Sequence, residues 1–410
     1  MNSTTSRFRL VRPVILAISI LMVVAGSRQS IGLLVNSIVA TTAMNIAQVS
    51  MAAAVGQLAW GLFQPFCGAL AGKIGTFRVI TLGMLCLAAG QAGAILASSP
   101  AALVVSMGIL SSAGAAAGSM SIIMGGLAPR LPEKKRSVTT GVINAGESAG
   151  HFVFPPLGQF FINLRGYTGA LGFLGAAALF AILPAWFLFG KGFTAEEKRP
   201  AAKAEEPPAG KGELAAKILS ALKTPAYLMV MAEFFTCGFH VSLFSTHLPG
   251  EIRFYGFSPN VAAFCFSIIG ICNIAGTIGS GILGKYIRLK YLLSCIYAIR
   301  VLIISVYFFV PKTELTFYIF AAGIGLTWNA TVPPTLGLVG KLCAGRFLAT
   351  LIGVVYFAHQ IGAFLGAWLG GLVIQQTGNL LWNWYIAAGL ALFAALIVLP
   401  IREKPLTQVN

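Results

Sequence analysis

Twelve apolar runs, each bounded by charged residues, Gly or Pro, make up most of this 410-residue chain. A run of about 20 apolar residues is long enough to cross a bilayer as a helix. Only 10% of the residues are charged and 57% are hydrophobic, which excludes an ordinary soluble domain. The sequence therefore predicts an all-α polytopic membrane protein with twelve transmembrane helices, at residues 13–38, 47–71, 79–97, 101–127, 138–162, 167–189, 225–247, 259–283, 291–310, 315–342, 347–371 and 381–400.

The basic residues are distributed unevenly between the two sides of these spans. If the N-terminus is cytoplasmic, 23 Lys and Arg residues fall in cytoplasmic segments, and the other side has only Arg165, Arg253 and Lys312. Because positive residues favour the cytoplasmic side, we expect both termini there, in a bacterial inner (cell) membrane. The net charge of +17 is spread over short connecting segments, which argues against a nucleic-acid partner.

A charged segment rich in Pro and Ala, residues 191–224, separates the sixth and seventh runs. This composition is typical of a flexible linker. We therefore predict an N-terminal six-helix bundle over residues 1–190, a cytoplasmic linker over 191–224 and a C-terminal six-helix bundle over 225–410. Within the linker, residues 214–222 are expected to form a short interfacial helix.

The two predicted bundles repeat one another at a separation of 212 residues. The pairs with this separation are Gly26 and Gly238, Gly72-Lys73 and Gly284-Lys285, Gly141 and Gly353, Gly150 and Gly362, and Gly158 and Gly370. Five pairs at one separation indicate parallel repeats. In transporters built this way, the binding site lies near the middle of the membrane between the repeats.

The loop between the second and third runs resembles that of the major facilitator superfamily. It reads GALAGKIGTFR from Gly68 to Arg78, and GILGK from Gly281 to Lys285 echoes it. The family's loop carries an Asp where this chain has Gly72. The resemblance implies a two-bundle fold in which helices 1, 4, 7 and 10 line a central cavity. The candidates for the inner-gate loop are Lys73, Gly75, Arg78 and Lys285.

Three short segments are similar to the monocarboxylate and oxalate/formate branch of this superfamily. They are RQSIG at 28–32, STHLP at 245–249 and HQIG at 359–362. Monocarboxylate carriers have an Asp and an Arg four residues apart in helix 8, where this chain aligns Asn273 and Thr277. The resemblance implies an organic-anion substrate whose positive partner would be Arg28 or Arg300.

Arg28 and His240 occupy equivalent positions in the two repeats. Arg28 lies roughly 22 Å along the first span, where a guanidinium is costly. Because a guanidinium can bind a carboxylate through two donors, we predict that Arg28 is the substrate-anion ligand. The alternative is a structural Arg that satisfies helix-end carbonyls or snorkels outward. His240 is predicted to bind the same anion, with a hydrogen-bonded packing residue as the equal alternative.

Glu147 and His359 are also 212 residues apart, on the fifth and eleventh spans. A carboxyl near the membrane centre suits a group that loads and releases a proton, so both residues are predicted to act in proton coupling or gating. The alternative is a permanently paired Glu147 that bridges the halves to Arg28 or His359. Residues at helical spacing from this pair are predicted to contribute to substrate binding: Asn144, Tyr356 and Gln360.

Arg300 and Glu233 are the other ionisable residues within the predicted spans. Arg300 is expected either to cap carbonyls near Asn273 or to pair with Glu233, and both residues remain candidates for coupling or gating. Trp328 and Asn329 precede Pro333-Pro334. They are predicted to line the cavity, as an aromatic wall and an amide ahead of a helix breakpoint.

Several function classes are disfavoured by what the sequence lacks. No GxxxxGK[ST] loop occurs, which argues against ATP-driven transport, and nothing indicates an enzyme. The seven Cys residues have no ligand spacing, so no metal or cofactor is predicted. We expect a monomeric secondary transporter that moves a small, monocarboxylate-like organic anion by alternating access, with proton coupling or by exchange. The alternatives are a proton-driven exporter of drugs or amphipathic metabolites, and a transporter-like receptor.

Overall fold

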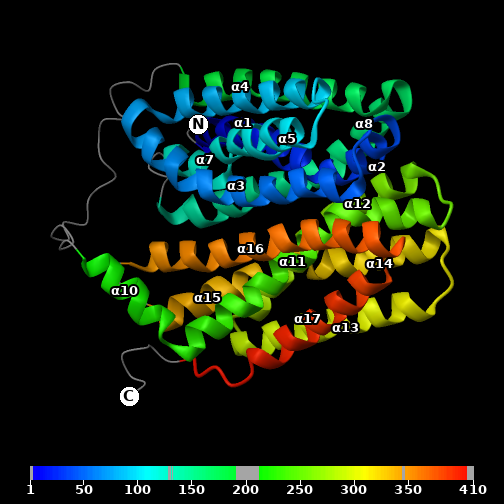
Figure 1. The fold of residues 1–410 in the computed structure, drawn as a ribbon. Coiled ribbons are helices and arrows are strands. Elements are labelled where there is room, and N and C mark those ends of the chain that lie inside the picture. Colours follow the sequence, from blue (N-terminus) through cyan, green and yellow to red (C-terminus); the bar gives the residue numbers. More distant parts are fainter. Residues whose placement is uncertain (1–2, 128–130, 132, 191–211, 344–346, 404–410) are drawn as a thin grey trace.

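The computed structural model describes residues 3–127, 131, 133–190, 212–343 and 347–403, and these residues are mostly helical (Figure 1). In Figure 1 the helices from the first half of the chain lie above those from the second half. The two sets run side by side and form two bundles.

The N-terminal bundle contains six spans. Its helical segments are α1 (Ser3–Gln29), α2 (Ile31–Thr41), α3 (Ile46–Ile74), α4 (Thr76–Ile95), α5 (Pro100–Leu103), η1 (Val104–Leu110), α6 (Ser111–Ala117), α7 (Met120–Leu127), α8 (Glu133–Phe180), α9 (Ile182–Ala185) and η3 (Trp186–Gly190). The first span is α1 plus α2, interrupted at Ser30. Helix α8 holds the fifth span and most of the sixth, because its backbone reverses at Arg165 and Gly166. Gly166 has a φ of +65°, which favours glycine at that turn.

The C-terminal bundle contains the other six spans and is preceded by a short helix, α10. Its segments are α10 (Glu213–Leu222), α11 (Pro225–Phe254), α12 (Pro259–Leu283), α13 (Leu289–Phe309), α14 (Glu314–Thr327), α15 (Val332–Leu342), α16 (Leu348–Thr377) and α17 (Leu381–Ile397). The tenth span is α14 plus α15, interrupted over residues 328–331. The predicted helix at 214–222 is confirmed as α10, whereas residues 191–211 of the predicted linker lie outside the described residues.

Ten helical stretches of the described chain are long and apolar enough to cross a membrane. One of them, Thr139–Gly190, covers 52 residues and holds two spans because of the reversal at Gly166. The 17-residue helix α17 supplies the twelfth span. The chain is therefore an all-helical integral membrane protein with twelve spans in the predicted order.

The seventh span is longer than the sequence indicates. The Pro249-Gly250 pair resembles a stop signal, yet α11 continues to Phe254. The extension places Glu251 inside the helix, only 3% exposed, where the hydroxyl of Tyr307 and the indole N–H of Trp384 donate to it at 3.1 and 3.0 Å. These two bonds offset the cost of burying the carboxylate. His247, expected at a helix end, is likewise internal to α11.

Equivalent helix pairs pack closely within each bundle. In the N-terminal bundle α1 lies along α8, with Gly150 against the carbonyl of Met22. In the C-terminal bundle α11 lies along α16, with Gly362 against the carbonyl of Phe235. A Cβ at either glycine would collide with backbone, so small residues are required here. Gly150 and Gly362 are one of the pairs separated by 212 residues, so the sequence repeat corresponds to repeated packing.

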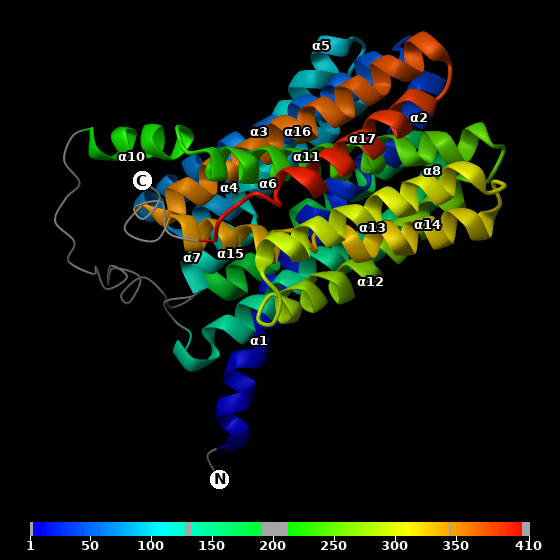
Figure 2. The same ribbon diagram turned by 90° about the horizontal axis from the view of Figure 1, so that it is seen from below.

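The two bundles meet along two main helix pairs, α3 with α16 and α8 with α12, and α2 also packs on α11. The α3 and α16 helices lie side by side in both views (Figures 1 and 2). An even number of spans returns the chain to its starting face, here called the termini face; the other is the far face. The contacts run from mid-membrane, where Gly61 meets Gln360, to the far face, where Gly32 meets Ser245. In this conformation the bundles are joined on the far side.

Candidate functional site

Arg28 lies in the last turn of α1, just before the interruption at Ser30. The carbonyl of Gly26 at this helix end accepts hydrogen bonds from the backbone N–H and the hydroxyl of Ser30, at 3.0 and 2.9 Å. This helix-end carbonyl is therefore satisfied by Ser30 rather than by Arg28. The guanidinium turns toward α3 instead.

Two side chains of α3 hold the guanidinium of Arg28. Its Nη2 donates to Oε1 of Gln57 at 2.8 Å, and its Cζ lies 3.7 Å from the centroid of the Trp60 ring. Stacking on an indole lowers the cost of a cation in an apolar setting. Among the described residues, Gln57 takes only one of the five N–H donors. Because Arg28 is partly exposed, the other donors are available to a ligand.

Ionisable side chains from both bundles interact electrostatically with Arg28. Glu147 and His151 on α8, and His359 on α16, lie within electrostatic range of it, and Tyr356 lies within range of Glu147. No described residue forms a hydrogen bond or an ion pair with Glu147. The structure thus brings together the predicted residues Arg28, Glu147, His359 and Tyr356, at mid-membrane between the bundles.

Several buried polar atoms near this cluster lack a hydrogen-bond partner in the described chain. They are Nε1 of Trp60, Nδ1 of His151, Nδ1 of His359 and Oε1 of Gln360. Buried polar groups are normally hydrogen-bonded, so unpartnered ones often indicate a ligand or water site. The cluster offers cationic donors, neutral donors and acceptors in one place, which suits a small polar anion.

His240 does not lie beside Arg28. Its Nε2 is 2.8 Å from the carbonyl oxygen of Ala387, and its Nδ1 is 3.2 Å from Nη1 of Arg300. These contacts fix the neutral tautomer in which Nε2–H donates to Ala387 and Nδ1 accepts from Arg300. At 1% exposure, His240 is a hydrogen-bonded packing residue inside the C-terminal bundle.

Arg300 satisfies the carbonyls that the break in the tenth span leaves free. Its Nη2 donates to the carbonyls of Thr327 and Trp328, and its Nε donates to the Thr327 hydroxyl at 3.3 Å. A broken helix loses intrahelical partners for its last carbonyls, and a guanidinium can supply several donors at once. Of the two expected roles for Arg300, the geometry corresponds to carbonyl capping rather than an ion pair with Glu233.

Glu233 is fully buried and is held by neutral donors. The hydroxyl of Tyr297 donates to Oε1 at 2.8 Å, and the hydroxyl of Thr335 donates to Oε2 at 3.2 Å. No cation of the described chain lies within ion-pair distance of the carboxyl. Glu233 therefore links α11 to α13 and α15 inside the C-terminal bundle, away from the Arg28 cluster.

The remaining predicted site residues are more dispersed. Trp328 is 2% exposed in the core of the C-terminal bundle, whereas Asn144 is exposed. The backbone N–H of Asn329 donates to Oδ1 of Asn273 at 3.0 Å. The inner-gate candidates lie on the termini face: Lys73, Arg78 and Lys285 are exposed, and Gly75, with φ of 92°, forms the turn between α3 and α4.

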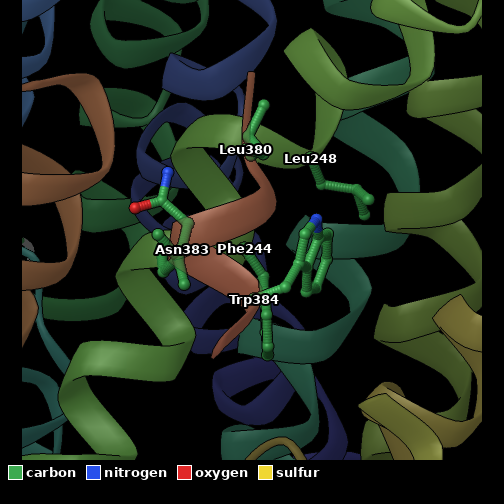
Figure 3. A pocket seen from close by; sticks show the side chains of 6 residues that line it. Phe244, Leu248, Leu380, Asn383 and Trp384 are labelled. Atoms are coloured by element: carbon green, nitrogen blue, oxygen red, sulfur yellow. The ribbon is translucent and has the colours of Figure 1, made fainter. Parts of the chain in front are cut away.

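A separate pocket lies between α11 and α17 (Figure 3). It is lined by Leu243, Phe244, Leu248, Leu380, Asn383 and Trp384, and it has no room for a water molecule. Its walls are mainly apolar and carry no charge, so it does not compete with the Arg28 cluster as a site for an anion.

Gln57 and Trp60, the two residues that hold Arg28, are not among the residues predicted from the sequence. A signal was present: Gln57 and Gln64 are amides within an otherwise apolar run, one helix away from Arg28. A polar residue in a membrane helix is costly and usually faces protein or a cavity. Trp60 follows Gln57 at helical i, i+3 spacing, so both lie on one face of α3.

Comparison with known proteins agrees with this architecture. The chain matches the sequence profile of the Major Facilitator Superfamily over residues 16–366 and 252–410. Monocarboxylate transporter 13 of Rattus norvegicus is 26% identical over 386 residues, which cover 92% of this chain and 86% of that protein. A hexuronate transporter of Bacillus subtilis is 24% identical over 304 residues, covering 67% of this chain and 68% of that protein.

A solved structure extends the similarity to three dimensions. The crystal structure of a D-xylose-proton symporter has a TM-score of 0.74 to this chain at 13% sequence identity, covering 97% of this chain and 98% of that one. At this identity the likeness concerns the fold alone. With the profile match over nearly the whole length and twelve spans in two bundles, the chain belongs to the major facilitator superfamily and is a transporter rather than an enzyme.

Proposed function

We propose that the protein is a secondary active transporter of a small organic anion of the monocarboxylate type. The observation that carries this proposal is the guanidinium of Arg28, which lies within the first span and donates one hydrogen bond, to Gln57, among the described residues. A carboxylate can accept two of these donors in parallel. The monocarboxylate transporters among the relatives support the same substrate class.

The proposed site also explains why transport alternates between two faces. Arg28, Gln57 and Trp60 belong to the N-terminal bundle, whereas Tyr356 and His359 belong to the C-terminal bundle. A site made by both bundles is exposed to one face or the other as the bundles rock about it. In this conformation the far side is joined, so we propose that substrate exchanges at the termini face.

Uptake by purified protein in proteoliposomes tests the proposal. A panel of radiolabelled carboxylates, a neutral sugar and a cationic drug would be offered with and without a pH gradient. We expect saturable uptake of one or more carboxylates and no uptake of the sugar. Transport of the drug alone would instead support the exporter alternative.

Glu147 is proposed as the group that couples protons to the anion. It lies within electrostatic range of Arg28 and has no hydrogen-bond or ion-pair partner of its own in the described chain, so its charge competes with a bound carboxylate for Arg28. We expect Glu147→Gln to retain exchange of labelled for unlabelled carboxylate and to lose accumulation driven by a pH gradient. Glu314→Gln, at an exposed helix start, is the matched control. Normal gradient-driven accumulation by Glu147→Gln would exclude this role.

Trp60 is proposed to orient Arg28 for substrate binding. Trp60→Leu removes the stacking contact, and cation–π contacts contribute about 1–2 kcal/mol when desolvated. We therefore expect the KM for the transported carboxylate to rise about 5- to 30-fold. Concentration-dependent initial rates measure this. Trp382→Leu, at an exposed position on α17, should leave KM unchanged.

The membrane orientation is part of the same proposal. The excess of Lys and Arg in segments on the termini face supports placing that face in the cytoplasm and the far face outside. The relatives include both bacterial and animal proteins. Residence in a bacterial cell membrane and function as a monomer therefore stay predictions of the sequence.

A further inference from the structure

Asn273 on α12 is a buried amide whose polar atoms are both used. It is 3% exposed. Its Nδ2 donates to the hydroxyl of Ser148 at 3.0 Å. Its Oδ1 accepts from the backbone N–H of Asn329 at 3.0 Å and from the hydroxyl of Thr277 at 3.2 Å. One side chain therefore contacts α8 of the other bundle and the interruption of the tenth span.

The orientation of this amide follows from its partners. A backbone N–H can only donate, so the atom of Asn273 that faces Asn329 must be the oxygen. The nitrogen must then face Ser148. This matters because Ser148 directly follows Glu147 in the proposed substrate site.

The bond to Asn329 exists because the tenth span is broken there. The interruption over residues 328–331 leaves backbone groups without helical partners, and these must be satisfied within the membrane. Arg300 takes the carbonyl side of the break, and Asn273 takes the N–H of Asn329. Asn273 thus stabilises one edge of this interruption.

The bond to Ser148 is the innermost of a row between α8 and α12. Toward the far face, the Ser267 hydroxyl donates to the Phe152 carbonyl at 2.8 Å, and Asn163 donates to Asn260 at 3.1 Å. Between described residues these are the hydrogen bonds that join the bundles. The outermost pair is exposed and competes with water, whereas the Asn273–Ser148 bond is buried. Breaking it without replacement leaves a buried donor unpaired, which is the costly case.

We propose that Asn273 is a positioning residue that latches the far side closed and ties this latch to the interruption of the tenth span. When the bundles part at the far face, the Asn273–Ser148 bond must break, and water entering the opening can take its place. The latch lies one residue from Glu147, so its state can respond to what occupies the substrate site. The latch rests on the part of the proposed function in which the two bundles move relative to each other, and it does not depend on which substrate is carried.

Hydrogen–deuterium exchange of the full-length protein in nanodiscs tests the latch. Ser148→Ala removes only the bond between bundles and keeps the bond from Asn329, whereas Asn273→Leu removes both. In each variant we expect exchange at residues 157–164 and 259–267, near the far face, to become about five-fold faster. Exchange at residues 67–74, near the termini face, should slow, because the far side opens as the termini side closes.

The matched control is Ser280→Ala. Ser280 is also a buried hydroxyl on α12, but it donates to the carbonyl of Thr277 in its own helix. Hydrogen–deuterium exchange of the Ser280→Ala variant should match that of the wild type on both faces. Unchanged exchange in Ser148→Ala would overturn the latch, as would faster exchange on both faces, since general loosening has no preferred face. If Asn273→Leu does not fold, Ser148→Ala alone decides the question. The latch is tested by hydrogen–deuterium exchange alone and the proposed substrate class by carboxylate uptake alone. Either proposal can therefore be refuted while the other stands.

Discussion

Replacement of Arg28 by Gln is expected to lower carboxylate uptake about 100-fold in kcat/KM. Gln keeps a donor for Gln57 but removes the charge and the paired donors that a carboxylate accepts. Loss of one partner of a hydrogen-bonded charge pair costs about 2–5 kcal/mol, and about 1.4 kcal/mol corresponds to a factor of ten. Initial rates of uptake into proteoliposomes measure the effect.

Two further variants make this result interpretable. Arg12→Gln is the matched control, because Arg12 lies on the same helix, α1, near the termini face. Its uptake should equal that of the wild type. Arg28→Lys keeps the charge but not the planar pair of donors, so we expect partial activity. Carboxylate uptake by Arg28→Gln at the wild-type rate would refute Arg28 as the anion ligand and, with it, the main support for the substrate class.

Replacement of Arg300 by Gln is expected to destabilise the protein strongly without acting on the substrate site directly. The change leaves the carbonyls of Thr327 and Trp328 and the acceptor nitrogen of His240 short of donors inside the membrane. Breaking a buried charged network costs about 3–5 kcal/mol. This corresponds to an apparent Tm lower by about 10 °C, which thermal unfolding followed by tryptophan fluorescence can measure.

The control for this variant is Arg253→Gln, at an exposed position near the far face. It should unfold at the wild-type temperature. Arg300→Lys should recover only part of the loss, because a single ammonium cannot reach two carbonyls and an imidazole together. An unchanged Tm for Arg300→Gln would mean that the broken tenth span does not depend on this cap.

The fold follows from the sequence because its cause is visible there. Each span needs about 20 apolar residues, and the predicted runs correspond to the observed helices. The helix interruptions are less visible. The first span breaks at Ser30, at the end of the polar stretch GSRQS at 26–30, but polar residues also occur in unbroken helices of this chain, and α11 passes through Pro249 without ending. Pro333-Pro334 does indicate the break in the tenth span, but the exact residues of a break depend on partners from other helices, such as the guanidinium of Arg300, which a local pattern does not position.

The candidate site was predictable in part, and its repeat symmetry shows where prediction stops. The 212-residue repeat relates Arg28 to His240, but equivalent helix positions need not have equivalent surroundings. His240 is bonded to Arg300, but the residue 212 positions before Arg300 is Ala88. The N-terminal bundle therefore has no equivalent of the Arg300 side chain that holds His240. The Arg28 side chain reaches Gln57 on α3, whereas the ring of His240 bonds to Ala387 and Arg300 within its own bundle. Periodicity gives the position of a residue, and its partners decide its role.

The way Arg28 is held has a consequence for synthesis of the chain. Gln57 follows Arg28 by 29 residues, so the hairpin of the first two spans already contains the partners of its own charge. A ribosome has only to extend the chain by one further helix before this guanidinium is sheltered. Arg300 has His240 in a helix made earlier and Thr327 in the next one made. Each of these two guanidinium groups can therefore insert into the membrane together with a helix that provides its hydrogen-bond partners. The free-energy cost of burying the charge is then lowered before the whole protein has been synthesised.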